Sequence, residues 1–281
     1  MTHDPKTLQD AILFFADADN CQAYLVARRW PKGVICPTCG SREVRFLDSR
    51  QVWCCKIRHP KWQFSVKVGT IFEDSPIGLD KWLTAMWMIG NCKNGVSSWE
   101  IHRAIGVTQK TAWFMLHRIR LAQQDSRTGG KLSGEVEVDE SFIGGKARFM
   151  HKSKRLARRG GRRIAPGPGG KTIVAAVLER GSEDAASRVR ATVVEKRRKA
   201  QLHALVRENV EPGSALYSDA LQSYNGLNAE YLHQVIDHAE AYVDGQVHTN
   251  GMENFWSLLK RGLHGTYVSV EPFHLFRYVD E

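Results

Sequence analysis

The chain has 281 residues, 42% of them hydrophobic, so it is long and apolar enough to bury the cores of two or three domains. Forty Lys and Arg residues against 30 Asp and Glu residues give a net charge of +10, which favours an anionic partner such as nucleic acid. No stretch approaches the ~20 consecutive apolar residues of a membrane span, and the opening MTHDPKTLQD lacks the pattern of a signal peptide, so we expect an unexported protein without a membrane partner.

Residues 1–30 form the first predicted segment. Apolar side chains recur there at mixed spacings of three and four residues, which predicts one or two short helices that serve for packing. Residues 31–72 differ, because paired cysteines and the β-rich runs EVRFL, QVWCC and WQFSVKV predict a small module built from hairpins. All six cysteines lie in the first third of the chain, which indicates metal ligation rather than a disulfide framework.

A zinc site is predicted inside this hairpin module. Cys36 and Cys39 supply two thiolates from one tight turn, as a tetrahedral zinc site requires. The second pair is predicted to be Cys55 and His59, with three residues between them. Cys54 and Cys55 are adjacent and point to opposite sides of a strand, so which of the two is the third ligand stays open. Four protein ligands leave no open position, so we expect the Zn²⁺ to be structural. In the alternative without further function, it only holds together a module that is too small to fold alone.

Residues 76–125 carry a helical pattern, with one apolar stripe formed by Leu79, Trp82, Leu83, Met86 and Ile89. A second helix starts near a cap signal at 97–100, and a turn containing Gly106 separates it from a third, so the order predicts a helix-turn-helix module. The side chains expected to face DNA are Gln109, Lys110, Thr111, Trp113, His117, Arg118 and Arg120, and those expected in the core are Ala112, Met115, Leu116 and Ile119. An ordinary three-helix bundle with a solvated basic face is the alternative.

After a Gly-Gly linker at 129–130, interleaved strands and helices predict an α/β domain over residues 132–281. The predicted strands are EVEVDESFI, KTIVAAVLE, SRVRATVV and ALYSD, and the predicted helices are EKRRKAQLHALVREN and NGMENFWSLLKRGL. Residues 146–171 hold ten Lys and Arg residues, no acid and several Gly and Pro, so we expect a mobile basic loop that lies along DNA. Its expected DNA contacts are Arg155, Arg158, Arg159, Arg162 and Arg163.

Three acidic residues are candidates for a catalytic metal site. Asp139 lies late in the run VEVDE, Asp219 closes the run LYSD, and Glu253 lies in the last predicted helix. Mg²⁺ prefers oxygen ligands, and two such ions ~3.5–4 Å apart stabilise the attacking and the leaving oxygen of a phosphodiester. Each acid alone is more often a turn cap or an ion-pair partner. Strand alternation puts Glu137 on the face of Asp139 and Glu140 on the other, so Glu137 is the rival for its role.

The helix that carries Glu253 has two distinct faces. Its polar face holds Asn250, Glu253, Ser257 and Lys260, and its apolar face holds Met252, Phe255, Leu259 and Leu263. This pattern suits a carboxylate that binds metal beside a Lys260 ammonium that holds DNA phosphate, with Arg261 as a further DNA contact. His248 and Asn250 are expected to support the site, where Asn250 or Thr249 can cap the helix. A plain amphipathic surface helix is the alternative.

Taken together, these residues resemble bacterial insertion-sequence transposases that combine an N-terminal zinc ribbon and a helix-turn-helix with a DDE catalytic domain of ribonuclease H-like fold. The matching stretches are CPTCG, QFSVKVGTIFEDSPIGLDKWLTAMWMI, NGVSSWEIHRAIGVTQKTAWFMLHRIR, VEVDESFIGG, LYSDALQSY and HTNGMENFWSLLKRGLHGTY with HLFRYVDE. They span nearly the whole chain and occur in the family's order.

The resemblance implies that Asp139, Asp219 and Glu253 are the DDE triad, that Lys260 is the basic residue found after it, and that Mg²⁺ or Mn²⁺ is the catalytic metal. In the implied reaction an activated water cuts DNA at the element's ends and exposes a 3′-hydroxyl, which then attacks target DNA. The implied partners are double-stranded DNA and further copies of the chain, because transposases generally bridge two DNA ends as multimers. The implied location is the bacterial cytoplasm, on the nucleoid.

The chain departs from the family pattern at two points. The second zinc pair is usually Cys-x-x-Cys, whereas here it is Cys55 and His59. Relatives continue past HLFRYVDE into a basic, aromatic segment, which leaves open whether this chain is C-terminally truncated. One alternative is therefore an inactive remnant that acts only as a zinc-dependent DNA-binding protein, and another is a structure-specific nuclease on the same fold.

Overall fold

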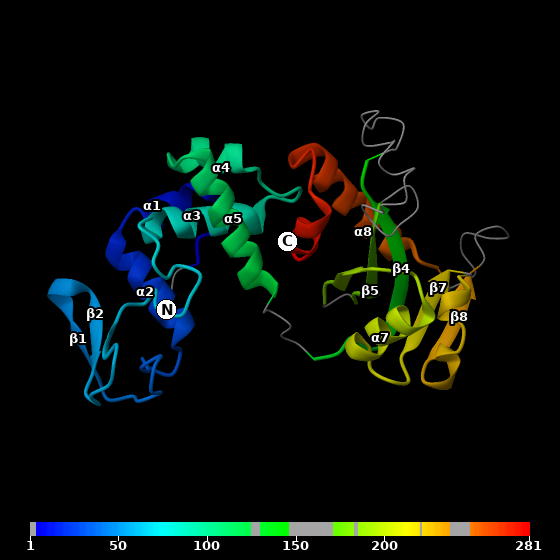
Figure 1. The fold of residues 1–281 in the computed structure, drawn as a ribbon, viewed down its shortest axis with the longest axis horizontal. Helices are drawn as coiled ribbons and strands as arrows, with labels where there is room; N and C mark the ends of the chain where they lie inside the picture. Colours follow the sequence, from blue (N-terminus) through cyan, green and yellow to red (C-terminus); the bar gives the residue numbers. More distant parts are fainter. Residues whose placement is uncertain (1–3, 125–129, 146–170, 183–184, 220, 237–247) are drawn as a thin grey trace, which may run out of the picture. The chain divides into compact units, whose positions relative to one another are not determined.

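The computed structural model describes residues 4–124, 130–145, 171–182, 185–219, 221–236 and 248–281 (Figure 1). The chain divides into two compact units, Met1–Gln123 and Gln124–Glu281. Within the described ranges, no helix is both long enough and apolar enough to cross a bilayer.

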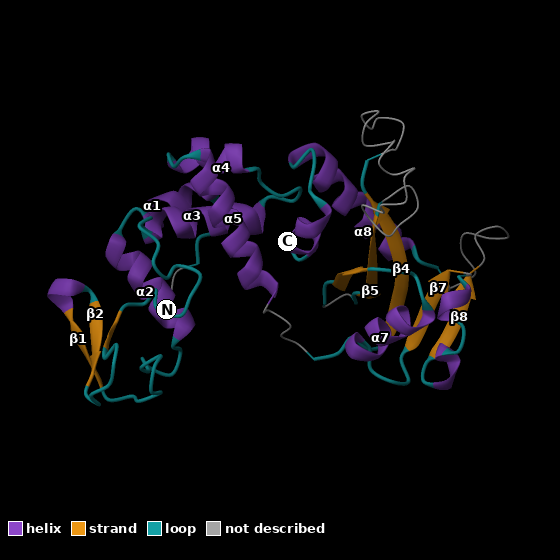
Figure 2. Cartoon of the chain, viewed as in Figure 1, coloured by secondary structure: helices purple, strands orange, loops and turns teal. Residues whose placement is uncertain are grey.

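The N-terminal unit combines helices with a small sheet (Figure 2). Its described elements, in chain order, are α1 (Leu8–Phe15), α2 (Ala18–Arg29), β1 (Val44–Leu47), β2 (Val52–Cys55), β3 (Gln63–Phe64), α3 (Leu79–Asn91), α4 (Ser98–Ile105) and α5 (Gln109–Gln124). The helices α1 and α2 confirm the prediction for residues 6–30. Side-chain caps start both of them, because the Thr7 hydroxyl accepts from the Asp10 N–H and the Asp17 carboxylate accepts from the N–H groups of Asp19 and Asn20.

The small sheet is antiparallel in the order β1-β2-β3, with Val44 paired to Cys55 and Trp53 paired to Phe64. Aromatic side chains supply much of its core, and the ring centroids of Trp30 and Trp53 lie 5.5 Å apart at an interplanar angle of 71°. A small module with so few buried side chains gains little hydrophobic stabilisation. We therefore expect a bound metal that joins its loops to add to the stability of the module.

The helices α3, α4 and α5 enclose the other main core of this unit, around Trp82, Ile101, Met115 and Leu116. Helix α4 begins in a capping box: the Ser97 hydroxyl accepts from the Glu100 N–H, and the Ser97 N–H donates to the Glu100 carboxylate at 2.6 Å. It ends at Gly106, whose φ of 64° lies in the left-handed region that glycine tolerates best. Both boundaries of α4 follow the sequence signals.

The C-terminal unit is built on one mixed sheet with strand order β6-β5-β4-β7-β8. Its described elements are β4 (Glu135–Ile143), β5 (Thr172–Glu179), β6 (Arg188–Val194), α7 (Lys199–Asn209), β7 (Ala215–Asp219), β8 (Leu232–Ile236), α8 (Asn250–Arg261) and α9 (Leu275–Val279). The strands β4, β5 and β6 pair antiparallel, whereas β7 runs parallel to β4 and β8 parallel to β7. The four predicted strands are present, and β8 is an additional one.

One predicted helix is shorter than expected. The run at 195–209 was expected to be helical throughout, but α7 begins at Lys199 with Arg198 as its N-cap. The preceding residues form a turn in which the Lys196 N–H donates to the Gln201 side-chain oxygen at 2.9 Å, so they are not available to the helix.

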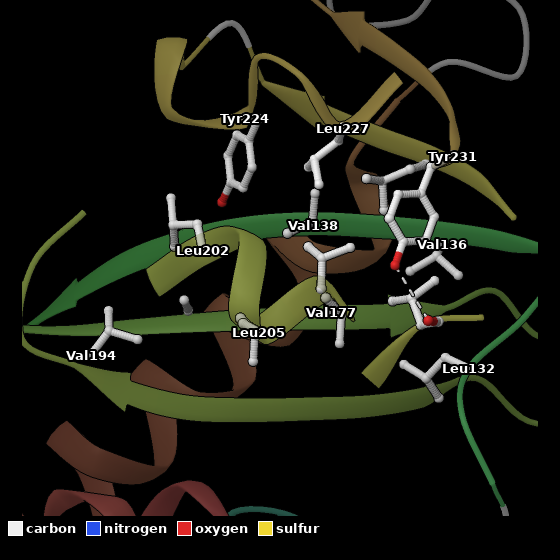
Figure 3. Close-up of a cluster of buried hydrophobic side chains, with 14 of the residues drawn as sticks. Leu132, Val136, Val138, Val177, Val194, Leu202, Leu205, Tyr224, Leu227 and Tyr231 are labelled. Atoms are coloured by element: carbon white, nitrogen blue, oxygen red, sulfur yellow. Dashed lines mark hydrogen bonds between the residues drawn. The ribbon is translucent and has the colours of Figure 1, made fainter. Parts of the chain in front are cut away.

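Both faces of the central sheet are covered. On one face, Val136 and Val138 of β4 pack with residues of α7, including Leu202 and Val206 (Figure 3). On the other face, alternate residues of β5 pack with Met252 and Trp256 of α8 and with Leu275 of α9; these strand residues are Val174, Ala176 and Leu178. Burial on both faces explains why the sequence of β5 is an almost continuous apolar run.

Candidate active site and metal centre

The side chains of Cys36, Cys39, Cys55 and His59 come together in the N-terminal unit. Their four candidate ligand atoms all lie within 4.8 Å of one another, with Cys36 Sγ 3.4 Å from His59 Nε2 and Cys39 Sγ 3.6 Å from Cys55 Sγ. Cys36 and Cys39 share a turn closed by the Gly40 N–H, which donates to the Cys36 carbonyl at 2.8 Å. Three sulfur atoms and one imidazole nitrogen fit the donor set of a closed, structural zinc site.

Strand β2 resolves which of the adjacent cysteines belongs to this cluster. Cys55 is a member and Cys54, one residue earlier, is not. His59 Nδ1 lies 2.7 Å from the Pro60 carbonyl oxygen, which can only accept, so Nδ1 carries the proton and Nε2 presents its lone pair to the thiols. Burial acts to raise the pKa of Cys36, but hydrogen bonds from the N–H groups of Cys39 and Thr38, together with those of the Cys39 and His59 side chains, lower that pKa to about 7. The cluster therefore suits thiolate ligation.

In the C-terminal unit, Asp139 and Asp219 lie side by side. The parallel strands β4 and β7 pair Val138 with Ser218, so the next residue of each strand is one of the two aspartates. Paired positions on neighbouring strands point to the same face of a sheet, so both carboxylates project toward the face covered by α8. The two aspartates are thus adjacent. Asp219 is the last residue of β7, but Asp139 lies in the middle of β4 rather than late in it, at the point where the pairing with β7 stops.

The surroundings of Asp139 make its negative charge costly. Burial raises the pKa of Asp139 to about 7, and the charges of Glu140 and Asp219 act in the same direction. Two hydrogen bonds oppose this rise, because the Trp256 Nε1–H donates to Oδ2 at 2.8 Å and the Glu140 N–H donates to Oδ1 at 2.7 Å. A partly buried carboxyl beside a second carboxylate is the kind of site that a bound cation stabilises.

Glu253 lies on α8, one turn before Trp256, and its side chain is exposed. Trp256 contacts Asp139, so a residue three positions earlier on the helix lies on the same side of it as the aspartates. Within the described part of the chain, the zinc-type cluster is the one group of three or more His, Cys, Asp or Glu residues close enough to hold a metal. The three acids therefore lie on one side of the sheet, but the Glu253 carboxylate is not close enough to the two aspartates to form a three-ligand group with them.

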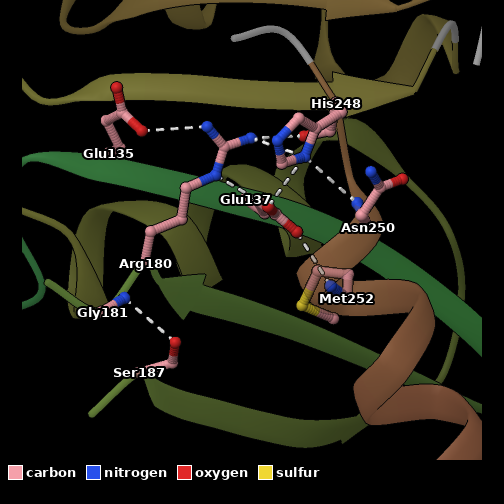
Figure 4. Close-up of polar contacts among 8 residues, drawn as sticks. All are labelled: Glu135, Glu137, Arg180, Gly181, Ser187, His248, Asn250 and Met252. Atoms are coloured by element: carbon pink, nitrogen blue, oxygen red, sulfur yellow. Dashed lines mark hydrogen bonds and ion pairs between the residues drawn. The ribbon is translucent and has the colours of Figure 1, made fainter. Parts of the chain in front are cut away.

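The rival acids have other partners. Glu140 points to the opposite face, where it accepts from the Tyr224 hydroxyl at 2.9 Å and pairs with Arg197 at 3.1 Å. Glu137 shares the face of Asp139 as strand alternation predicts, but its side chain is only 1% exposed and is bound by Arg180 and by the Met252 N–H (Figure 4). Protein partners thus occupy the Glu137 carboxylate, so it is not a candidate metal ligand.

Comparison with known proteins identifies the family. Residues 131–281, more than half of the chain, match the family model described as the ISXO2-like transposase domain. The chain belongs to this family. Residues 16–57 match the transposase zinc-ribbon domain, so family models match two of the parts of the transposase that the sequence resemblance implies.

Two relatives agree with the family assignment. An uncharacterized protein in transposable element ISH50 of Halobacterium salinarum is 27% identical over 246 residues, which cover 84% of this transposase and 79% of that protein. An uncharacterized transposase-like protein of Haemophilus influenzae is 35% identical over 95 residues, which cover 34% of this chain and 76% of that protein.

The surface of α5 partly fits the predicted DNA-facing set of the transposase. Lys110 is exposed, and Gln109, Thr111 and Arg118 are partly exposed. His117 and Arg120 correct the prediction, because their exposures are 8% and 1%. The buried side of α5 is wider than the predicted four-residue stripe, and the His117 ring packs edge-on against Trp113 with centroids 4.2 Å apart.

The remaining predicted phosphate contacts divide into two sets. Lys260 and Arg261 are exposed at the end of α8, where the transposase can present them to DNA. The five arginines of the basic loop lie outside the described residues; these are Arg155, Arg158, Arg159, Arg162 and Arg163.

Sequence reasoning missed two residues that contact acidic side chains of β4, Trp256 and Arg180. Trp256 reads as one more apolar residue of an amphipathic helix, and its position three residues after Glu253 is the signal that places it on the acidic side. Arg180 follows the apolar strand β5 and contacts Glu135, Glu137 and His248. A lone arginine directly after a strand gives no indication of these partners.

Proposed function

We propose that this chain is a Mg²⁺- or Mn²⁺-dependent DDE transposase that cleaves DNA at the ends of an insertion sequence and joins them to target DNA. The observation that carries the proposal is the pair Asp139 and Asp219, held side by side where the parallel pairing of β4 with β7 ends, with Glu253 on the helix that contacts Asp139. The antiparallel strands β6, β5 and β4 followed by the parallel β7 and β8 support a ribonuclease H-like fold for residues 132–281.

The donor atoms fit the proposed metal. Asp139, Asp219 and Glu253 offer only carboxylate oxygens, which hard divalent cations prefer, and the raised pKa of Asp139 reflects repulsion and burial that a cation offsets. Bound divalent ions supply Lewis-acid stabilisation of the attacking and the leaving oxygen. Residues of the chain hold the geometry: Trp256 and the Glu140 N–H fix the two oxygens of Asp139, and Lys260 two turns after Glu253 offers an ammonium for a DNA phosphate.

The N-terminal unit is proposed to bind DNA. Its Cys36, Cys39, Cys55 and His59 cluster holds a structural Zn²⁺, and α4, the turn at Gly106 and α5 form a helix-turn-helix whose contacts include Gln109, Lys110, Thr111 and Arg118. The domain limits 31–72, 76–125 and 132–281 stay predictions. The proposed partners are double-stranded DNA of the nucleoid and further copies of the chain, which together bridge two element ends.

A cleavage assay tests the proposal. Asp139→Asn should abolish metal-dependent nicking of element-end DNA and leave DNA binding intact. Glu140→Gln is the matched control, because it neutralises the adjacent acid on the opposite face of the sheet and should retain cleavage. Nicking retained by Asp139→Asn would contradict the catalytic role of Asp139, whereas no nicking by the parent protein would support the alternative of a remnant that only binds DNA.

A second assay separates transposition from simple cleavage. Pre-cut element ends with a free 3′-hydroxyl are mixed with target DNA, so that a new phosphodiester bond forms as a target bond breaks. Joined product that requires Asp139 and Glu253 excludes the alternative of a structure-specific nuclease. Cleavage without joined product would favour that nuclease.

A further inference from the structure

We propose that Glu137 and Trp256 fix the axial register of α8 on β4 and thereby place Glu253, which makes them positioning residues for the acidic site. This inference rests on the proposed function for the role of Glu253. It concerns two side chains whose partners are 115 and 117 residues away along the chain.

The first contact lies at the start of α8. The Met252 N–H donates to Glu137 Oε2 at 2.8 Å, and Met252 is the third residue of the helix. From Glu253 onward the helical ladder uses the backbone N–H groups, because the Glu253 N–H donates to the Thr249 carbonyl at 3.0 Å. A carboxylate can therefore accept from this backbone only at the first turn, so the bond to Glu137 specifies one position of the helix along the strand.

The second contact lies one helical turn further on, where the Trp256 Nε1–H donates to Asp139. Both hydrogen bonds measure 2.8 Å, so one placement of α8 on β4 satisfies the two contacts at once. A slip by one turn would move the helix about 5.4 Å and break both. Glu253 lies between the two contacts.

Buried partners hold Glu137 in place (Figure 4). The Arg180 guanidinium donates to Glu137 Oε1 at 2.8 Å and to the His248 carbonyl at 2.8 Å, two residues before α8 begins. It also lies 4.4 Å from the centre of the Tyr217 ring. One arginine thus links the strand carboxylate to the chain entering the helix, so both sides of the first contact are fixed together.

Gly251 allows the close approach of α8 to Glu137. A Cβ atom at this position would lie 2.9 Å from Glu137 Oε2 and 3.1 Å from Leu178 Cδ2. Glu137 is bound by Arg180 and cannot swing aside freely, so Gly251→Ala should push the first turn away from the strand while every polar partner stays in the sequence.

The test combines two measurements on the full chain carrying its zinc. Amide hydrogen exchange of α8 is recorded without Mg²⁺ or Mn²⁺, with β5 as internal reference, and the dissociation constant for Mn²⁺ is measured by the electron paramagnetic resonance of free Mn²⁺. The variants are Glu137→Ala, Glu137→Gln, Gly251→Ala and Glu253→Gln. Glu135→Gln is the matched control, because Glu135 also binds Arg180 at 2.9 Å but is 45% exposed and has no bond to α8.

We expect Glu137→Ala and Gly251→Ala to accelerate exchange in α8 at least tenfold relative to β5. The same two variants should weaken Mn²⁺ binding about tenfold or more, as loss of supporting residues does in other metal sites. Glu137→Gln keeps an oxygen for the Met252 N–H, so most of the α8 protection and most of the Mn²⁺ affinity should be retained in this variant. The exchange rate of α8 and the Mn²⁺ dissociation constant of Glu135→Gln should stay within about twofold of the parent values, because this variant loses only one exposed ion pair.

Unchanged α8 exchange in Glu137→Ala and Gly251→Ala would overturn the register proposal, whatever happens to Mn²⁺. If Glu137→Ala does not fold, Gly251→Ala decides, because it leaves Glu137 and Arg180 intact. Failure of the proposed function looks different: Glu253→Gln would bind Mn²⁺ as tightly as the parent, whereas fast α8 exchange in Glu137→Ala would still support the register contact.

Discussion

Replacing Asp139 by asparagine is expected to stabilise the protein at neutral pH when Mg²⁺ and Mn²⁺ are absent. The reason is that burial raises the pKa of Asp139 to about 7 from 3.8, so the folded state holds a proton that the unfolded chain releases. Asparagine keeps an oxygen for the N–H groups of Trp256 and Glu140 and removes only the charge. The predicted effect is therefore electrostatic.

The magnitude follows from the size of this rise. A shift of about three units corresponds to about 4 kcal/mol at full effect, and water that enters the site reduces it, so we expect a gain of about 1–4 kcal/mol for Asp139→Asn at pH 8. Between pH 4 and pH 7 the folded state binds more protons than the unfolded state, so the stability of the parent protein falls as the pH rises through this window. Above pH 7 the difference between the two proteins should be constant, and near pH 4 it should be small.

Urea unfolding followed by circular dichroism at pH 4.5, 6 and 8 measures this difference, in buffers that leave the zinc in place. Added Mn²⁺ should reverse the order at pH 8, because it binds the folded parent protein and not the variant. Equal unfolding free energies at pH 8, or a difference that does not shrink at pH 4.5, would show that the Asp139 carboxyl carries no such penalty.

Three further outcomes are expected. Cys39→Ser should reduce bound zinc below one ion per chain and unfold the ribbon, whereas Cys54→Ser should keep the zinc. Metal analysis with circular dichroism distinguishes the two variants. Zinc loss in both would contradict the ligand set. Glu140→Ala should lower the free energy of unfolding by about 1–3 kcal/mol, because Tyr224 and Arg197 lose their acceptor, and an unchanged urea midpoint would argue against it. Neutralising four of the arginines at 155, 158, 159, 162 and 163 should flatten the slope of log K for DNA against log salt by up to about 3.6, and an unchanged slope would remove the loop from the DNA interface.

The local signals in the sequence predicted local structure well. The box at Ser97 and the glycine at 106 set both ends of α4, and the apolar run before Arg180 became the doubly covered strand β5. Strand β8 was missed because its apolar residues do not mark a buried face: Leu232 is 68% exposed and Val235 is 48% exposed. An edge strand of this kind is specified by its pairing with β7, which periodicity does not reveal.

The helix α5 shows a second limit of periodicity. A stripe of four apolar residues predicted its core correctly, but it assigned every long polar side chain to the outside. His117 and Arg120 are buried although both side chains are polar, so an assignment by polarity alone misplaces them. The predicted DNA-facing residues that are exposed or partly exposed are Gln109, Lys110, Thr111, Trp113 and Arg118.

The two candidate metal sites differ in what the chain must do to form them. The zinc ligands lie within one short module, so their spacing predicted the set except for the choice between Cys54 and Cys55, and the structure selects Cys55. The acidic site depends on contacts between residues more than a hundred positions apart, such as Met252 with Glu137 and Trp256 with Asp139. Its two aspartates also repel each other, so they do not draw the helix into place by themselves. The neutral donors of α8 and the partly buried Arg180 supply that attraction. The residues that arrange the site are therefore not the residues that its chemistry suggests from sequence.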